Sequence, residues 1–395
     1  MVISQLLIGV MYLLTARAAS PAVFGQAVVS LSVATILVVL FDMGLSSYLV
    51  REVASARLTV AEAFGIVRAK QVAAPVLVGV AFVASSVTGL DSLSAFLVGL
   101  VALFTWEAQS SNALLRAQKR FGLCSRNQVL ARVIAVLWLV VAGRFLNPIL
   151  ALAAGLVLAW ALEGCANLIT GGTPRSKPTD LGRSASAQRA AFTYGLSSLS
   201  GSAQQLDTPA VSVGGGIYAA GLYGAAGRLQ GPLTFMSQSM AAVAAPWLAR
   251  ASDQRAQLLR EERRIQKLAA ILAVAPLIAA AVGPFLIPLL LTDSYKSSVT
   301  TFIILCFGAS LLSLNQSAIV ILQNRHDTGF VAAALASSIA AGLLATYLLA
   351  RSGDASLAAL GYVLTQGSLL GSTQFRLRKL RRCELVACEE GTGNA

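Results

Sequence analysis

Hydrophobic side chains occur in long continuous runs along nearly the whole chain, and short polar stretches separate these runs. The runs are about 20 residues long, the length that an α-helix needs to cross a bilayer, whereas barrel strands would alternate over about 10 residues. Only helices and closed barrels satisfy their backbone hydrogen bonds inside hydrocarbon. The pattern therefore predicts an all-α integral membrane protein.

The runs divide into twelve predicted transmembrane helices. Their expected ranges are 2–20, 26–48, 71–90, 93–114, 129–146, 149–170, 191–213, 223–248, 268–291, 298–322, 328–350 and 355–375. The longest polar interruption separates six helices from six, and an even number per half gives both halves the same orientation in the membrane. We therefore expect two parallel six-helix lobes around a central cavity. The expected division is an N-terminal lobe (1–170), a cytoplasmic linker (171–190), a C-terminal lobe (191–375) and a cytoplasmic tail (376–395).

A faint internal repeat supports the two parallel halves. The string Pro-Ala-Val-Phe-Gly-Gln-Ala begins at Pro21, just after the first helix, and Tyr-Ala-Ala-Gly-Leu-Tyr-Gly-Ala begins at Tyr218, just after the seventh. The first hydrophobic run has no basic region before it, so we interpret it as a retained first helix and not as a signal peptide.

Basic residues are distributed unevenly over the predicted loops. Of the 30 Lys and Arg residues, 25 fall in even-numbered loops or the C-terminal tail, four fall in odd-numbered loops, and Arg228 lies inside a predicted helix. Cytoplasmic loops accumulate Lys and Arg, so we expect the even loops and both termini to face the cytoplasm, in the cell (inner) membrane. The formal net charge of +13 therefore indicates topology and not binding to nucleic acid.

Composition narrows the function further. The chain is 56% hydrophobic and only 12% charged, against about 25% charged in a typical soluble domain. The five cysteines have no metal-ligand spacing, and no nucleotide-binding loop, zinc signature or nucleophile elbow is present. We expect a transporter without a cofactor. A membrane glycan polymerase is a distant alternative, because such enzymes generally need a large outward loop, and the outward loops here are short.

Three acidic residues lie within predicted helices of the first half. Asp42, Glu107 and Glu163 each precede the cytoplasmic end of their helix by about six residues, or about 9 Å at 1.5 Å per residue. Charged groups inside a bilayer must face a partner or a cavity. Crowded carboxylates favour binding of H⁺ or Na⁺, so these three are candidate coupling-ion residues. The alternative is that each pairs with a nearby Arg.

The second half carries a different pair of charges. Asp207 and Arg228 lie in consecutive predicted helices near the same end, so they either form an ion pair or leave Arg228 to bind a phosphate group. Arg17 is the corresponding basic residue of the first half, although it could simply extend to the interface. Gln204 and Gln238 offer hydrogen bonds to sugar hydroxyls, or alternatively between helices. These five are the candidate substrate-binding residues.

Helix-breaking residues are concentrated in the seventh predicted helix. Pro209 is followed by Gly214, Gly215 and Gly216. Proline removes a backbone hydrogen bond and glycine tolerates unusual dihedral angles. Interrupted helices often mark the moving parts of transporters. We expect a hinge here, although proline is also tolerated in ordinary membrane helices.

Several strings resemble the polysaccharide flippases, the oligosaccharidyl-lipid branch of the multidrug and polysaccharide exporter superfamily. They are Ser20 to Ala27, Asp42-Met-Gly-Leu with the following Arg51-Glu, Asp207 with Gly216 to Leu229, and Ala245-Pro-Trp-Leu. The resemblance implies a two-lobed, V-shaped bundle that moves an undecaprenyl-pyrophosphate-linked glycan between leaflets. Members of this family line the cavity with basic groups, which here would be Arg17 and Arg228.

The leading hypothesis is thus a lipid-linked oligosaccharide flippase for surface polysaccharide biosynthesis, working by alternating access with a H⁺ or Na⁺ gradient. A cation-coupled multidrug antiporter of the same superfamily is the alternative. The expected partners are the lipid-linked glycan and membrane lipids. The protein is expected to be a monomer, with the glycan-assembly machinery as its candidate protein partner.

Overall fold

The structure is a computed structural model that describes residues 2–171, 181–251, 255–325 and 327–392. Those residues are almost entirely helical and contain no β-strand. Eight of the helical stretches are long and apolar enough to cross a membrane. Each of the twelve predicted ranges contains helix, which confirms the predicted all-α fold in two lobes.

The helices of the N-terminal lobe follow one another with short turns. They are α1 (Val2–Ala18), α2 (Pro21–Asp42), α3 (Leu45–Ala54), α4 (Val60–Lys70), the short 3₁₀ helix η1 (Gln71–Ala73), α5 (Ala74–Val87), α6 (Ser92–Ala117), α7 (Phe121–Ala142) and α8 (Pro148–Gly171). Local capping fixes several of these ends. The Ser20 hydroxyl accepts from the Val23 N–H at the start of α2. Asp91 precedes α6 and accepts from the Ser94 N–H at 3.0 Å, which lowers the pKa of its carboxyl group.

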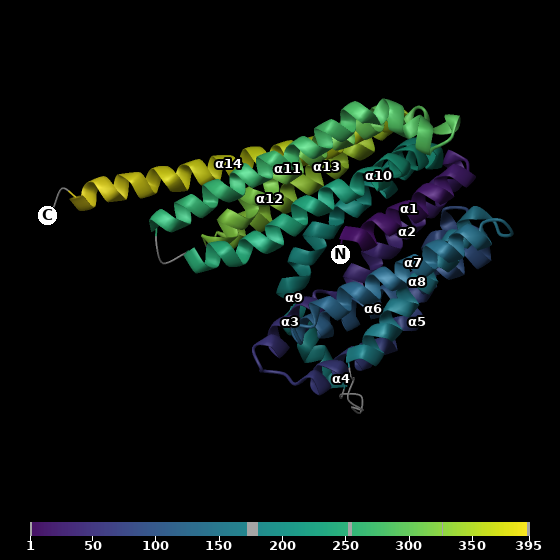
Figure 1. Cartoon of the computed structure of the whole chain (residues 1–395), viewed down its shortest axis with the longest axis horizontal. Helices are drawn as coiled ribbons and strands as arrows, with labels where there is room; N and C mark the ends of the chain where they lie inside the picture. The colour runs from purple at the N-terminus through teal and green to yellow at the C-terminus, as the bar shows by residue number, and fades with distance from the viewer. Residues whose placement is uncertain (1, 172–180, 252–254, 326, 393–395) are drawn as a thin grey trace.

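The C-terminal lobe contains the longer helices. They are α9 (Leu181–Ser202), the 3₁₀ helix η2 (Ala203–Leu206), α10 (Asp207–Ala251), α11 (Arg255–Leu290), the 3₁₀ helix η3 (Asp293–Tyr295), α12 (Ser298–Asn324), α13 (Thr328–Ala350) and α14 (Ala355–Thr392). The lobes meet along α1, α2 and α10. They diverge toward the end of the molecule at which α3 and α4 lie on one side and the start of α11 and the end of α14 lie on the other (Figure 1).

The two lobes touch most closely where α2 crosses α10. Gly25 and Gly221 face each other there: a Cβ atom built on Gly221 would overlap the carbonyl oxygen of Pro21, and one built on Gly25 would overlap that of Ile217. Only glycine permits this approach of two backbones. Both glycines belong to the strings of the internal repeat, so the repeated segments of the two halves pack against each other.

The second predicted helix is broken where the sequence led us to expect continuous helix. The range 26–48 was predicted as one helix, but α2 ends at Asp42, and Met43 and Gly44 adopt left-handed conformations with φ of 42° and 77°. The Asp42 carboxylate accepts from the N–H and the hydroxyl of Ser46, and so caps the start of α3. The predicted helix therefore begins earlier, at Pro21, and turns sharply at its other end.

The predicted linker is partly helical and is docked on the N-terminal lobe. The helix α9 starts at Leu181, within the range 171–190, and Ala187 and Ala191 join a buried cluster with residues of α3, α4 and α6. Gly195 lies against the turn after α2, where an added Cβ would be 2.5 Å from the carbonyl oxygen of Met43. Residues 172–180 lie outside the described residues. Thus α9 begins in contact with one lobe and leads into the other (Figure 1).

The interruption of the seventh helix lies before Pro209 and not at it. The chain changes to 3₁₀ geometry over Ala203–Leu206, and Pro209 is the third residue of α10, where the missing N–H costs nothing. Of the three predicted hinge glycines, only Gly216 leaves helical geometry, with φ 85° and ψ 170°. It forms the turn between the seventh and eighth crossings. Gly214 and Gly215 pack against the backbone of α13 near Tyr347 and Ala350.

A cavity between the lobes

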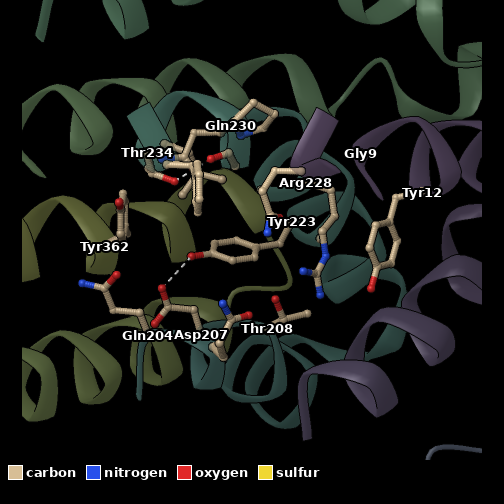
Figure 2. Close-up of a pocket in the computed structure, with 18 of the residues that line it drawn as sticks. Gly9, Tyr12, Gln204, Asp207, Thr208, Tyr223, Arg228, Gln230, Thr234 and Tyr362 are labelled. Carbon is tan, nitrogen blue, oxygen red and sulfur yellow. Dashed lines mark hydrogen bonds between the residues drawn. The ribbon is translucent and has the colours of Figure 1, made fainter. Parts of the chain in front are cut away.

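A polar cavity lies between the two lobes and has a volume of about 290 Å³. Its walls come from α1, η2, α10, α12 and α14. They include Gln5, Ile8, Gly9, Tyr12, Gln204, Gln205, Asp207, Thr208, Tyr223, Arg228, Gln230, Thr234, Gln238, Leu305, Leu312 and Tyr362. Four of the five predicted substrate-binding residues, Gln204, Asp207, Arg228 and Gln238, therefore belong to one wall. Figure 2 shows three of them, Gln204, Asp207 and Arg228, around a common space.

Arg228 reaches from the C-terminal lobe to the N-terminal lobe. Its guanidinium carbon lies 4.4 Å from the centre of the Tyr12 ring on α1, and its Nη2 donates to the Ser32 hydroxyl of α2 at 3.4 Å. A cation over an aromatic face contributes about 0.5–2 kcal/mol, and the hydrogen bond is long. These contacts orient the guanidinium group but leave much of its hydrogen-bonding capacity unused. Arg228 is the one cation among the described residues of the cavity wall.

Asp207 is the one acid in the same wall, and it does not pair with Arg228. Its Oδ2 accepts from the Tyr223 hydroxyl at 3.3 Å (Figure 2). Counted from the turn at Gly216, Asp207 is nine residues away and Arg228 is twelve, a depth difference of about 4.5 Å at 1.5 Å per residue. Arg228 also points toward α1. Of the two alternatives that the sequence left open, this conformation therefore lacks the ion pair, and both side chains remain available to ligands.

Uncharged polar groups make up most of the remaining wall. Five glutamines contribute amides and three tyrosines, Tyr12, Tyr223 and Tyr362, contribute ring faces and hydroxyls. Amides and hydroxyls both donate and accept, as sugar hydroxyls require. Sequence reasoning missed the tyrosines because it searched the helices for ionisable groups. The spacing of the tyrosines did not indicate a binding site, since aromatic residues in membrane helices more often pack against other helices than contact a ligand.

Arg17 does not line the cavity. It lies in the last turn of α1 and is exposed, whereas the cavity uses the first three turns, from Gln5 to Tyr12. Arg17 is five residues beyond Tyr12, a separation of about 7.5 Å along the helix. In this conformation the cavity has one basic group and not the two that the sequence suggested.

Asp42 belongs to a buried cluster inside the N-terminal lobe. Its Oδ1 accepts from Lys70 Nζ at 3.3 Å, and Lys70 also donates to the Ser110 hydroxyl and lies 4.2 Å from the centre of the Trp106 ring. Lys70 was counted among the loop cations from the sequence, but its side chain is only 6% exposed. It neutralises Asp42.

Glu163 is neutralised in the same way by a second cation. Arg132 Nη2 donates to its Oε2 at 2.7 Å, and Asn112 donates to its Oε1 at 2.6 Å. The Arg132 guanidinium also stacks on Trp160 at 3.7 Å. Removing one partner of such a buried pair typically costs about 3–5 kcal/mol, because the other charge is left unpaired. The pair therefore contributes to holding α7 and α8 in place, a role the sequence could not specify.

Glu107 forms no ion pair with the residues that the structure describes. Its Oε2 accepts from the Gln71 amide at 3.0 Å, and its Oε1 is buried without a hydrogen-bond partner in the described part of the chain. The three acids thus do not converge, and the described residues contain no group of three acidic, His or Cys side chains able to hold a metal ion. None of the three lines the cavity. Their coupling role stays a prediction, and Glu107 is its strongest remaining candidate.

One polar pair in the C-terminal lobe holds helices together instead of facing the cavity. Asn315 on α12 donates from Nδ2 to the backbone carbonyl of Gln366 at 2.8 Å and to its side-chain oxygen at 3.0 Å, and both residues are fully buried. This contact matches the alternative that polar residues join membrane helices.

Residues 14–300 match the family described as "Polysaccharide biosynthesis protein". The chain belongs to this family. The match covers most of the N-terminal lobe and continues through α10 and α11, so both cavity charges fall within it. No curated protein sequence matches the chain significantly.

Solved structures show the same fold at low sequence identity. An inward-facing multidrug resistance MATE family transporter of the MOP superfamily has a TM-score of 0.72 at 13% identity, covering 96% of both chains. The lipid II flippase MurJ, in an inward closed conformation, has a TM-score of 0.67 at 10% identity, covering 95% of this chain and 86% of that one. A MOP superfamily transporter from Pyrococcus furiosus gives 0.58 at 12%, covering 95% of both.

The family match and the eight apolar helices show a multi-pass membrane protein of the polysaccharide biosynthesis family, and its fold is similar to those of a MOP superfamily transporter and of the flippase MurJ. Transporters are thus among the solved structures that share this fold.

Proposed function

We propose that this protein is a flippase that carries a lipid-linked oligosaccharide across the cell membrane for surface polysaccharide biosynthesis. The observation that carries the proposal is a cavity between two lobes with a single guanidinium group, Arg228, amid amides and tyrosines. A sugar head group cannot cross hydrocarbon unaided, whereas its polyprenyl chain can stay in the bilayer. The polysaccharide family match supports this cargo, and MurJ, which flips lipid II, has a similar fold.

Arg228 would bind the pyrophosphate of the carrier lipid. Guanidinium groups bind phosphate through two parallel hydrogen bonds, which are stronger than the contacts Arg228 now makes. Since those contacts are to Tyr12 and Ser32 of the other lobe, phosphate binding would release a link between the lobes. This exchange connects cargo binding to the lobe movement that alternating access requires.

The remaining wall favours a glycan with little charge. Besides Arg228 and Asp207, its polar residues are neutral amides and hydroxyls. An acidic glycan would bring negative charges that one arginine cannot neutralise. We therefore infer that the transported sugars near the pyrophosphate are uncharged.

Asp207 is the best placed residue for coupling to H⁺ or Na⁺. It is the one acid in the cavity wall, and among the described residues its hydrogen-bond partner is the Tyr223 hydroxyl. Asp42 and Glu163 are already neutralised, and Glu107 lies outside the cavity. A carboxylate without a cation in an apolar setting binds a proton or cation readily. Coupling at Asp207 would place the ion beside the cargo.

Replacing Asp207 by asparagine is expected to uncouple transport from the ion gradient. The amide keeps the shape and a hydrogen bond to Tyr223 but cannot titrate. In proteoliposomes, an imposed pH or Na⁺ gradient should accelerate glycolipid translocation by the wild type and leave the variant at its gradient-free rate. Asp293→Asn, at an exposed acid paired with Lys296 before α12, is the control and should respond as the wild type does. Undiminished stimulation of Asp207→Asn would refute coupling at this residue.

The cation-coupled multidrug antiporter remains the second candidate, because the MATE transporter shares the fold and the cavity contains an acid. The cation Arg228 in the same wall repels the cationic drugs that such a carrier would bind. The flippase therefore fits the cavity better.

Deletion of the gene followed by lipid analysis tests the proposal directly. The flippase predicts that lipid-linked glycan accumulates in the cytoplasmic leaflet and that surface polysaccharide falls. Normal distribution of the glycolipid between leaflets would reject the flippase, and hypersensitivity to cationic drugs alone would support the antiporter.

The basic end of the bundle is expected to face the cytoplasm. Labelling of a cysteine introduced at Gln257 from outside intact cells would contradict this orientation.

A further inference from the structure

The start of α11 carries a separate cluster of cations on the outside of the C-terminal lobe. Arg260, Arg263, Arg264 and Lys267 are all exposed and recur at positions i, i+3, i+4 and i+7, so they share one face of the helix. With Leu268 and Ile271 they line a shallow depression of about 540 Å³. This depression is remote from the cavity between the lobes, with which it shares no residue.

The acids of this helix do not balance the cluster. Glu262 faces away, is 1% exposed and accepts from Arg325 at 2.7 Å and Arg381 at 3.2 Å. Glu261 lies 3.8 Å from Arg264. Arg260, Arg263 and Lys267 form no ion pair with any residue that the structure describes. Like charges one helical turn apart repel each other, so this face needs an anion from outside the protein.

Beyond the cluster the same face becomes apolar. Leu268, Ile271, Val274 and Ile278 are exposed, with Ile271 67% exposed. From Leu268 to the end of α11 at Leu290 the helix rises about 33 Å, close to the thickness of the hydrocarbon core of a bilayer, about 30 Å. Lys267 therefore lies at the membrane surface, and Arg260 lies about 10 Å farther out. A ligand for this face needs an anionic head next to an apolar tail.

We propose that the basic face of α11 binds the phosphate group of an anionic phospholipid of the surrounding bilayer. The cations contact the head group, while Leu268 and Ile271 contact the start of an acyl chain. The lipid neutralises the repulsion along the helix and fixes the C-terminal lobe at one leaflet. Cations near an anionic membrane surface are attracted to it in this way, and here four of them are held in one depression.

Native mass spectrometry of the full-length protein tests the site with phosphatidylglycerol and phosphatidylcholine at equal concentrations. The wild type should retain phosphatidylglycerol in preference by about tenfold or more. The triple variant Arg260→Gln, Arg263→Gln, Lys267→Gln should lose that preference. The matched control Arg378→Gln, Lys379→Gln, Arg382→Gln removes three exposed cations from α14 and should keep it.

Three outcomes would overturn the proposal. They are retention of phosphatidylglycerol by the α11 triple variant, equal loss in both triple variants, and displacement of the lipid by inorganic phosphate at matched concentration, which would indicate a site for free anions. If the triple variant fails to fold, the single variant Arg263→Gln decides, with an expected loss of about two- to fivefold. Full retention by a folded Arg263→Gln variant contradicts the site.

Discussion

Substituting glutamine for Arg228 is expected to stop export of the lipid-linked glycan almost completely. The variant removes the one cation from the described cavity wall. Hydrogen bonds to a charged group contribute about 1.5–3 kcal/mol each, so loss of a two-pronged phosphate contact should lower the translocation rate by about 100-fold or more. Arg228→Lys keeps the positive charge but loses the two parallel N–H donors of the guanidinium group, so it should retain intermediate activity. Translocation of a pyrophosphate-linked glycan in proteoliposomes measures both.

The matched control is Arg17→Gln. Arg17 is also a basic residue of a crossing helix, but it is exposed and outside the cavity, so its loss should leave translocation near the wild-type rate. Equal loss in both variants would show that any basic residue of the crossing helices matters and that the cavity does not select the cargo.

Arg228→Gln also separates the two candidate functions. Lost glycan export with unchanged drug sensitivity supports the flippase, and the reverse pattern supports the antiporter.

The sequence predicted those features of the fold that depend on a pattern extending over many residues. The hydrophobic runs correctly predicted helix in all twelve ranges. A segment that crosses the membrane must form all its backbone hydrogen bonds within itself, and a helix does so. The cavity charges were also predictable, since Asp207 and Arg228 are costly inside a membrane and must face polar surroundings. The sequence did not predict that Asp207 and Arg228 lie apart. Their separation depends on the turn at Gly216 and on the contact of Arg228 with Tyr12 of the other lobe.

Pairing between distant helices was the main feature that the sequence concealed. The count of basic residues assigned Lys70 and Arg132 to loops, so the sequence did not identify them as the partners of Asp42 and Glu163. Only the three-dimensional structure shows that these charges meet, because it brings the end of α4 to the end of α2 and packs α7 against α8. The break after Asp42 had a weak local signal, the Met43-Gly44 step, which the continuous hydrophobic run outweighed.

The docking of α9 was hidden for a related reason. A polar segment between two halves suggests a linker, yet Ala187, Ala191 and Gly195 are small enough to let α9 lie directly on the N-terminal lobe. Small residues at helix contacts are common in membrane proteins. They carry no hydrophobic periodicity that would reveal which partner they approach.

The crossing of α2 and α10 is expected to tolerate no side chain at position 221. A methyl group on Gly221 would overlap the carbonyl oxygen of Pro21, and backbone cannot move aside as a side chain can. Gly221→Ala must therefore separate the two helices. Overpacking typically costs about 1–3 kcal/mol. We expect a lower unfolding temperature and loss of glycolipid translocation, since this crossing is where the lobes touch while they diverge at the opposite end (Figure 1).

The control for this substitution is Gly367→Ala in α14, where an added Cβ meets nothing within 4 Å. An alanine inside a helix stabilises it by about 0.5–1 kcal/mol relative to glycine, so the control should unfold at the same or a higher temperature and translocate normally. Thermal unfolding in detergent and translocation in proteoliposomes compare the two. If Gly221→Ala matched Gly367→Ala in both measurements, the close contact between the repeated segments could not be the fixed point of the lobes. A Gly25→Ala variant should repeat the effect of Gly221→Ala from the other helix, because its methyl group would overlap the carbonyl oxygen of Ile217.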